Sequence, residues 1–220
     1  VNSGLDTAAN SGFTAVLTMP STYPPIQNKS DIQFLLKKAE NHIVDLLPTG
    51  CITKNCEQKE ITEMFDMYQN GSIAFTDDKK SIQNAMLMNT ALEYVKNFDG
   101  LIMASCLDKN LNQNGQINEG KMSVQMGLNP LPEIAENILV MRDLSLLKAT
   151  DSKLHISTIS TKESVKLIKK AKKKKLKIST DVAAHQLILS EDLLNKFDTN
   201  LKVMPPLRDE KNRLALIEGI

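Results

Sequence analysis

The sequence has no tryptophan, and aromatic residues make up only 4% of it. Surfaces that stack nucleic-acid bases depend on such rings, so a base-stacking function is disfavoured. The 27 basic and 26 acidic residues leave a net charge of +1, which gives no overall attraction to nucleic acids or membranes. No apolar run approaches the roughly 20 residues of a membrane-spanning helix, and the first residues do not resemble a signal peptide. These absences predict a soluble cytoplasmic protein.

Cysteine and histidine are also scarce, with three of each. Three cysteines cannot all pair, which is typical of a reducing compartment. Cys51 and Cys56 lie five residues apart without a second pair, which is weak evidence for a zinc site. Cys106 follows an expected strand and could act as a nucleophile, but no histidine is obviously placed to activate it. His42 opens an expected strand at its non-catalytic end, so we expect a structural role for it.

The most informative positive feature is a regular spacing of apolar segments. Four short apolar runs, each ending in a polar or Pro/Gly-rich tip, begin 29 residues apart at Thr14, Ile43, Ser72 and Leu101. The stretches between them have helical spacing. A parallel βαβ unit needs roughly this many residues for one strand, one loop and one helix. The spacing therefore predicts an α/β fold of the barrel type.

The remaining segments extend this series to six parallel strands, two fewer than a closed eight-stranded barrel has. The expected strands are 14–20, 43–47, 73–76, 101–106, 154–159 and 176–182, with a short extension at 201–203. The expected helices are 4–11, 30–41, 59–69, 81–97, 130–148 and 161–174. With 220 residues and 41% hydrophobic content, the chain can bury one core, so we predict a single domain over 1–220.

Three segments carry more specific expectations. Residues 108–120 are rich in Asn, Gln and Gly, which predicts a long mobile loop. The lysine-rich run 166–177 is interpreted as a solvated helix face with Ile168 and Ala171 turned inward; a basic binding patch is the alternative. Asp77 and Asp78 follow an expected strand and are candidates for a metal-binding carboxylate, although an N-cap for helix 81–97 fits the spacing equally well.

Co-linear motifs connect these segments to a known family. They are Gly12-Phe13-Thr14, Met19-Pro20-Ser21-Thr22, Pro24-Pro25-Ile26, Leu47-Pro48-Thr49-Gly50, Ala74-Phe75-Thr76-Asp77-Asp78, Ile117-Asn118-Glu119-Gly120, Pro205-Pro206-Leu207-Arg208 and Arg213-Leu214-Ala215-Leu216. Over essentially its whole length, the chain resembles bacterial dihydroorotases of the amidohydrolase superfamily. The resemblance implies a (β/α)8 TIM barrel that uses Zn²⁺ to interconvert N-carbamoyl-aspartate and dihydroorotate in pyrimidine synthesis.

The resemblance also implies where the site residues lie. Asp77 matches a metal ligand of the family, whereas Ser105 and Thr158 occupy positions at which the family has metal-binding histidines. A hydroxyl is a far poorer zinc ligand than an imidazole. Ser21 and Met204 stand where the family has substrate-binding asparagines. We therefore expect a degenerate member with no bound zinc, and we assign no catalytic residue.

Three functions remain open at this stage. The first is an inactive scaffold or regulatory protein, with aspartate carbamoyltransferase or a second copy of the chain as candidate partner. The second is an active cyclic amidohydrolase, either with ligands from the missing ends of the barrel or with a rearranged site at Asp77, Cys106 and His185. The third is a sensor that binds a pyrimidine precursor. The family motifs His-x-His-x-Arg and Asp-His-Ala-Pro do not occur in 1–220, so we expect the first and last barrel strands to be absent from this chain.

Overall fold

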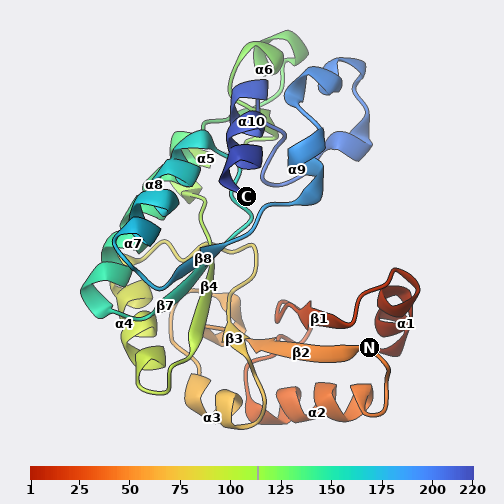
Figure 1. The fold of residues 1–220 in the computed structure, drawn as a ribbon, viewed down its shortest axis with the longest axis vertical. Helices are drawn as coiled ribbons and strands as arrows, with labels where there is room; N and C mark the ends of the chain where they lie inside the picture. The colour runs from red at the N-terminus through yellow and green to blue at the C-terminus, as the bar shows by residue number, and fades with distance from the viewer. Residues whose placement is uncertain (113) are drawn as a thin grey trace. The chain divides into compact units, whose positions relative to one another are not determined.

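The computed structural model describes residues 1–112 and 114–220, and the chain divides into two compact units (Figure 1). Unit 1 is Val1–Ala104 and unit 2 is Ser105–Ile220. All six strands expected from the apolar runs are present among the described residues. Within the same residues, no helix has the length and the apolar character that a membrane crossing requires.

Unit 1 is built from the 29-residue repeat. Its strands are β1 (Ala15–Thr18), β2 (Asp45–Gly50), β3 (Ala74–Phe75) and β4 (Leu101–Ser105), and each pairs in parallel with the next. Its helices are α1 (Asn2–Asn10), α2 (Lys29–Ala39), α3 (Met64–Gln69) and α4 (Ala85–Lys96). The expectation of parallel strands joined by helices is confirmed for this unit.

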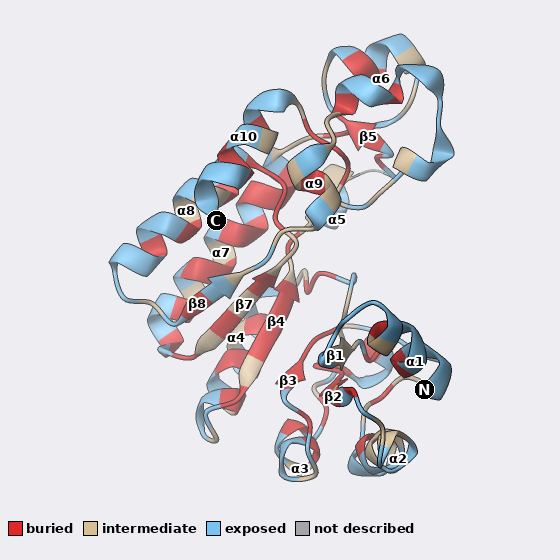
Figure 2. Cartoon of the chain, turned by 45° about the vertical axis from the view of Figure 1, so that its right-hand side comes forward, coloured by how far each residue is buried: buried red, intermediate tan, exposed pale blue. Residues whose placement is uncertain are grey.

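The core of unit 1 lies around its central strands, which Figure 2 colours as buried. Phe75 of β3 and Ile102 of β4 are fully buried and lie in register with each other. The ring of Phe98, which follows α4, contacts Phe75 edge-on with centroids 6.1 Å apart. Such edge-to-face packing adds to the free energy gained by burying the rings. These contacts anchor β3 in the core beside β4.

Helix α4 begins later than the sequence analysis predicts, at Ala85 rather than residue 81. Its N-cap is Asn84, whose side-chain oxygen accepts hydrogen bonds from the amides of Met86 and Leu87. The interpretation of Asp77 and Asp78 as the cap of this helix is therefore wrong. An asparagine directly before the first turn satisfies the free amides at shorter range than an aspartate several residues earlier.

Unit 2 contains the strands β7 and β8 and the longest helix of the described residues, α7. Its elements are α5 (Lys109–Asn112), β5 (Ile117–Asn118), α6 (Lys121–Met126), β6 (Pro130–Leu131), α7 (Ile134–Thr150), β7 (Lys153–Ser157), α8 (Lys162–Lys173), β8 (Ile178–Thr180), α9 (Ala184–Ile188) and α10 (Glu210–Gly219). β7 and β8 pair in parallel, with Leu154 opposite Ile178.

The segment 108–120 is not the continuous loop that its composition predicts, apart from Gln113, which lies outside the described residues. It contains α5 and β5, and β5 pairs in parallel with β6. Gly115 permits this approach, because a Cβ atom there would come within 2.7 Å of the carbonyl oxygen of Pro130. The pairing also explains why α7 begins at Ile134 and not at residue 130. The strand expected at 201–203 is absent, and a short 3-10 helix covers Thr199–Leu201 instead.

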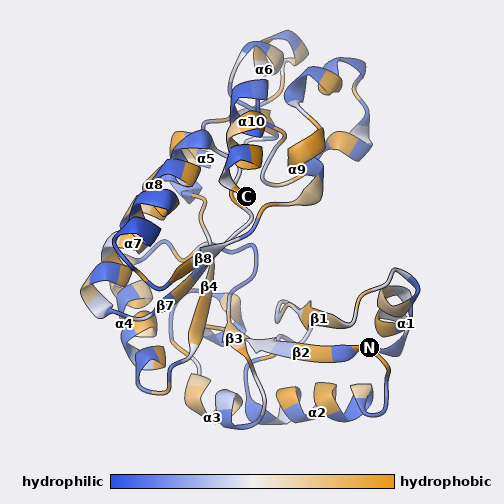
Figure 3. Cartoon of the chain, viewed as in Figure 1, coloured by the Kyte–Doolittle hydropathy of each residue, from blue (hydrophilic) through white to orange (hydrophobic). Residues whose placement is uncertain are grey.

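The lysine-rich run forms the outer face of α8, as predicted. Ser164, Ile168 and Ala171 are buried, whereas the lysines are exposed, and Figure 3 colours most of this helix as hydrophilic. The apolar residues recur at helical spacing, so one side of the helix packs and the other is solvated. The solvated-face interpretation accounts for this segment without a ligand.

A buried arginine ties several parts of unit 2 together. Arg208 donates from Nη1 to the side chain of Asn118 and to the carbonyl of Leu131, both at 2.8 Å, and from Nε to Ser160 at 3.0 Å. Glu136, also buried, accepts from the amide of Ser160 at 3.0 Å. Burial lowers the pKa of Arg208 below its usual value, while nearby Glu136 opposes the change. The network is therefore a structural element of unit 2, in which Nη2 of Arg208 has no hydrogen bond and lies 4.0 Å from the Glu136 carboxylate.

Candidate functional site

Asp77 lies in the loop that follows β3 and is 2% exposed. Its Oδ1 atom accepts hydrogen bonds from the amides of Ile52 and Thr53, both at 2.9 Å, and its Oδ2 atom accepts from the hydroxyl of Thr53. Burial raises the pKa of Asp77, and the bonds from Thr53 and Ile52 oppose that rise. The carboxyl ends of β2 and β3 thus meet here, as expected for neighbouring parallel strands.

The segment that holds Asp77 is itself tightly folded. Thr53 forms an antiparallel bridge with Ile61, and the Thr62 hydroxyl donates to the carbonyl of Cys51 at 2.6 Å. Asn55 and Cys56 adopt positive φ angles of 55° and 50°, which turn the chain back on itself. The donors to Asp77 are consequently fixed in place by contacts on both sides of the turn.

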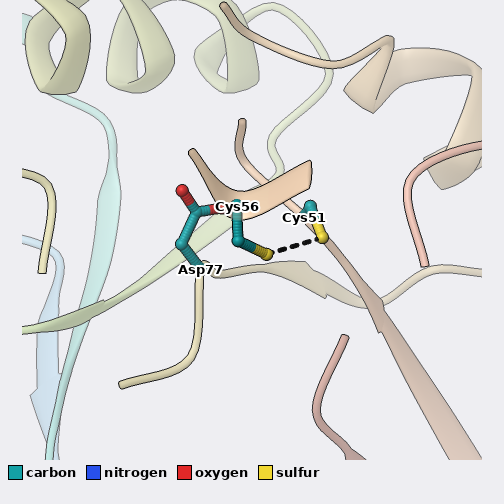
Figure 4. A group of neighbouring side chains, drawn as sticks. All are labelled: Cys51, Cys56 and Asp77. Atoms are coloured by element: carbon teal, nitrogen blue, oxygen red, sulfur yellow. Dashed lines mark hydrogen bonds between the residues drawn. The ribbon is translucent and has the colours of Figure 1, made fainter. Parts of the chain in front are cut away.

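Cys51 and Cys56 lie beside Asp77, as Figure 4 shows. Their sulfur atoms are 3.0 Å apart and share a hydrogen bond. This bond raises the pKa of Cys51 and lowers that of Cys56. The three residues form the one group among the described residues whose possible ligand atoms all lie within 4.8 Å. Sequence spacing alone pointed to the cysteines but could not place a carboxylate beside them.

Asp78 is engaged separately from Asp77. It has a positive φ of 56°, and its carboxylate accepts a hydrogen bond from the hydroxyl of Ser21. Its amide donates to the Thr76 side chain at 3.0 Å. The structure therefore connects Ser21, one of the positions implied by the resemblance, to the strand end that carries the two aspartates.

In unit 2, Thr158 follows the end of β7 and belongs to a small polar cluster. Its amide donates to Oδ1 of Asp181 at 2.8 Å, and its hydroxyl donates to the same oxygen at 3.2 Å. His155 contacts the other carboxylate oxygen of Asp181 through Nε2 at 2.8 Å and Ser179 through Nδ1 at 2.9 Å. Both ring nitrogens are therefore hydrogen-bonded.

Asp181 is the residue of this cluster that the sequence analysis missed. Burial alone would raise its pKa, but the hydrogen bonds from His155 and Thr158 outweigh that effect and lower the pKa. The available signal was its position directly after the strand around Ile178–Thr180, where a barrel places functional side chains.

The other candidates from the sequence have distinct environments. Cys106 is buried and donates to a carboxylate oxygen of Asp143 at 3.5 Å. Burial, with Asp143 adding to the effect, raises the Cys106 pKa well above its usual value, which keeps the thiol protonated and argues against a nucleophile. His42 contacts Asp6 at 3.2 Å and accepts from the Val44 amide, as a structural residue does.

Ser105 and Met204 complete the positions implied by the resemblance. Ser105 ends β4 and is half-buried, whereas Met204 is 45% exposed. Asp77 belongs to unit 1, while Ser105 and Thr158 belong to unit 2. One carboxylate and two hydroxyls do not fit a zinc ion, because zinc sites in proteins are built from thiolate, imidazole and carboxylate ligands. We derive no reaction step through zinc from these three residues.

Comparison with known proteins decides the family. A family model described as dihydro-orotase-like matches residues 1–164. The chain belongs to this family. It is 41% identical to a dihydroorotase of Caldicellulosiruptor saccharolyticus over 221 aligned residues and 37% identical to one of Syntrophus aciditrophicus. Each alignment covers 100% of the chain but only 51% and 52% of the relatives, so the chain spans about half the length of the curated relatives it matches.

The solved structures agree on the fold. An L-hydantoinase from Arthrobacter aurescens matches with a TM-score of 0.80 at 19% identity, over 96% of this chain and 49% of its own. A dihydroorotase from Saccharomyces cerevisiae in complex with 5-fluoroorotic acid matches with a TM-score of 0.72 at 13% identity, over 97% of this chain and 60% of its own. The six strands therefore correspond to half of an amidohydrolase barrel, which confirms the predicted fold class.

The hydrogen bonds of Asp77 lead to a test of its structural weight. Asp77→Ala leaves two buried backbone amides and one buried hydroxyl without acceptors. We therefore expect the free energy of unfolding to fall by about 2–4 kcal/mol. Urea denaturation followed by circular dichroism measures this loss. The matched control is Asp66→Ala, which removes a surface carboxylate 3.6 Å from Lys29 and should cost less than about 1 kcal/mol. Equal losses in the two variants would show that the Asp77 contacts contribute nothing special.

Proposed function

We propose that this chain is part of a dihydroorotase-like protein of pyrimidine biosynthesis that has lost zinc-dependent hydrolysis and acts as a scaffold or regulatory partner. The observation that carries the proposal is the donor chemistry at the strand ends. The resemblance assigns ligand roles to the positions of Asp77, Ser105 and Thr158, and only the first of these offers a strong zinc ligand.

The contacts of Thr158 support this proposal. Its hydroxyl donates a hydrogen bond to the Asp181 carboxylate, so the one polar group of the Thr158 side chain is already engaged. The nearby His155 does not substitute for a missing ligand, because its two ring nitrogens are engaged by Asp181 and Ser179. A neutral imidazole with both nitrogens hydrogen-bonded has no free lone pair for a metal.

The hydrogen bonds of Asp77 also support the proposed loss of zinc-dependent hydrolysis. Its two oxygens accept three hydrogen bonds from Ile52 and Thr53, so the carboxylate already has a structural function. An amide-hydrolysing metal site must lower the pKa of a bound water toward neutrality, and this requires a firmly held cation. A single carboxylate whose oxygens already accept three hydrogen bonds does not hold such a cation.

The positions of Ser21 and Met204 bear on the substrate. The resemblance places substrate-binding asparagines there, and each amide side chain would supply both a donor and an acceptor. Ser21 instead donates to Asp78, and Met204 has no strong hydrogen-bonding group. Loss of orienting contacts would slow a hydrolase even if a metal were present.

The first test concerns zinc. We expect the full-length protein, dialysed against excess zinc and then against buffer, to retain much less than one zinc ion per chain by elemental analysis. The variant Cys51→Ala/Cys56→Ala separates zinc held by the thiols from zinc held at the strand ends. Stoichiometric zinc that persists in this double variant would contradict the proposal and favour the active amidohydrolase.

The second test concerns activity. We expect no ring closure of N-carbamoyl-aspartate and no opening of dihydroorotate above the buffer rate, because both metal and substrate contacts are replaced. The variant Ser105→His/Thr158→His should remain inactive, since Ser21 and Met204 still fail to orient the substrate. The dihydroorotase of Caldicellulosiruptor saccharolyticus, assayed in parallel, is the positive control. A zinc-dependent rate from the unmodified protein would refute the inactive assignment.

A scaffold role further requires a binding partner. β1 and β8 each pair with one neighbour among the described strands, and in β1 Ala15 is exposed while the rest is half-buried. Parallel strands are normally covered on all sides, so such edges favour association. We expect light scattering of the full-length protein to give an assembly larger than one chain, alone or after mixing with aspartate carbamoyltransferase. A monomer under both conditions at high concentration would leave the scaffold role unsupported.

A further inference from the structure

Two cysteines that the proposed function does not use lie in one short turn of unit 1. Cys51 directly follows β2, and Cys56 ends the 3-10 helix Lys54–Cys56. Their sulfur atoms are 3.0 Å apart (Figure 4), whereas a disulfide places them about 2.05 Å apart. A movement of about 1 Å would therefore bring the two sulfurs to bonding distance.

The backbone of the turn holds both residues in this arrangement. The amide of Cys51 donates to the carbonyl of Ile26 at 2.8 Å, and the amide of Cys56 donates to the carbonyl of Thr53 at 3.0 Å. The Thr62 hydroxyl donates to the carbonyl of Cys51 at 2.6 Å. The cost of closing the loop between the two cysteines is thus already met by the folded chain.

The distance also discriminates between a disulfide and a shared metal ion. Two thiolates on a tetrahedral zinc ion, each about 2.3 Å from the metal, lie roughly 3.8 Å from each other. The observed sulfur separation is well below that value. The third member of the group, Asp77, already accepts three hydrogen bonds through its two oxygens. The pair is thus better arranged for a covalent bond than for a metal.

We propose that Cys51 and Cys56 are a redox modification site and form an intramolecular disulfide when the protein meets a hydroperoxide. One thiol gives up its proton and its sulfur attacks a peroxide oxygen; the O–O bond breaks, the sulfur becomes a sulfenic acid, and the departing hydroxide takes up the proton and leaves as water. The second thiol then attacks this sulfur, the S–S bond forms, and a second water leaves with the two remaining protons. In sum, two thiols and one hydrogen peroxide give one disulfide and two waters.

The position of the turn gives this bond a consequence. The amides of Ile52 and Thr53, which hold Asp77, lie between the two cysteines in the chain. A bond from Cys51 to Cys56 closes a ring around these donors and restricts their movement. Oxidation would therefore act on the loop that positions the Asp77 carboxylate, and reduction by a thiol would reverse it.

Mass spectrometry tests the proposal directly. The full-length protein is treated with hydrogen peroxide, unfolded in the presence of an alkylating agent and digested with trypsin without reduction. Cleavage after Lys54 separates the two cysteines, so the disulfide is expected as peptide 39–54 linked to peptide 55–59. The linked species should weigh two hydrogens less than the sum of its parts and should separate after treatment with dithiothreitol.

Cys106 provides the matched control within the same sample. Cys106 is buried like the pair, but its thiol donates to Asp143 and not to another thiol. Peptide 97–109, which contains Cys106, should therefore remain alkylated. Cys51→Ser should abolish the linked species and leave Cys56 alkylated or oxidised alone. The proposal is overturned if peptides 39–54 and 55–59 stay alkylated after oxidation as in the reduced protein, or if either pairs with peptide 97–109.

Discussion

The described part of unit 1 depends on one buried carboxylate. Asp77 links the end of β3 to the turn after β2, because its two oxygens accept hydrogen bonds from the amides of Ile52 and Thr53 and from the Thr53 hydroxyl. A buried carboxylate without such donors would be strongly destabilising. The same geometry that stabilises the turn places the thiols of Cys51 and Cys56 beside Asp77.

Unit 2 shows the same use of an acidic side chain at a strand end. Asp181 collects the amide and hydroxyl of Thr158 and one nitrogen of His155. In both units the acceptors are matched by donors from the chain itself. Both carboxylates are therefore engaged by hydrogen bonds from residues of their own unit.

The sequence predicted the strands better than the contacts. The 29-residue spacing located β1 to β4 because one strand, one loop and one helix have a fixed length in a parallel unit. It missed the β5–β6 pair, because a two-residue strand that contains a proline has no periodicity to detect. It also missed that Asp77 lies beside Cys51 and that Asp181 receives Thr158, since both contacts join residues more than 20 positions apart. Such contacts follow from the fold and not from local pattern.

Thr158 has a further property that follows from its backbone. Its φ angle of 54° lies in the left-handed region, which is rarely occupied by a β-branched residue and costs about 1–2 kcal/mol. The bonds to Asp181 offset part of this strain, and they are strongest while that carboxylate is ionised. Because the pKa of Asp181 is lowered in the folded chain, the carboxylate stays ionised to a lower pH than an ordinary aspartate does, and the bonds weaken only when it takes up its proton. The end of β7 should therefore keep its backbone conformation until the pH falls below the usual range for an aspartate, whereas Asp143 and Glu191, whose pKa values are raised, take up their protons earlier.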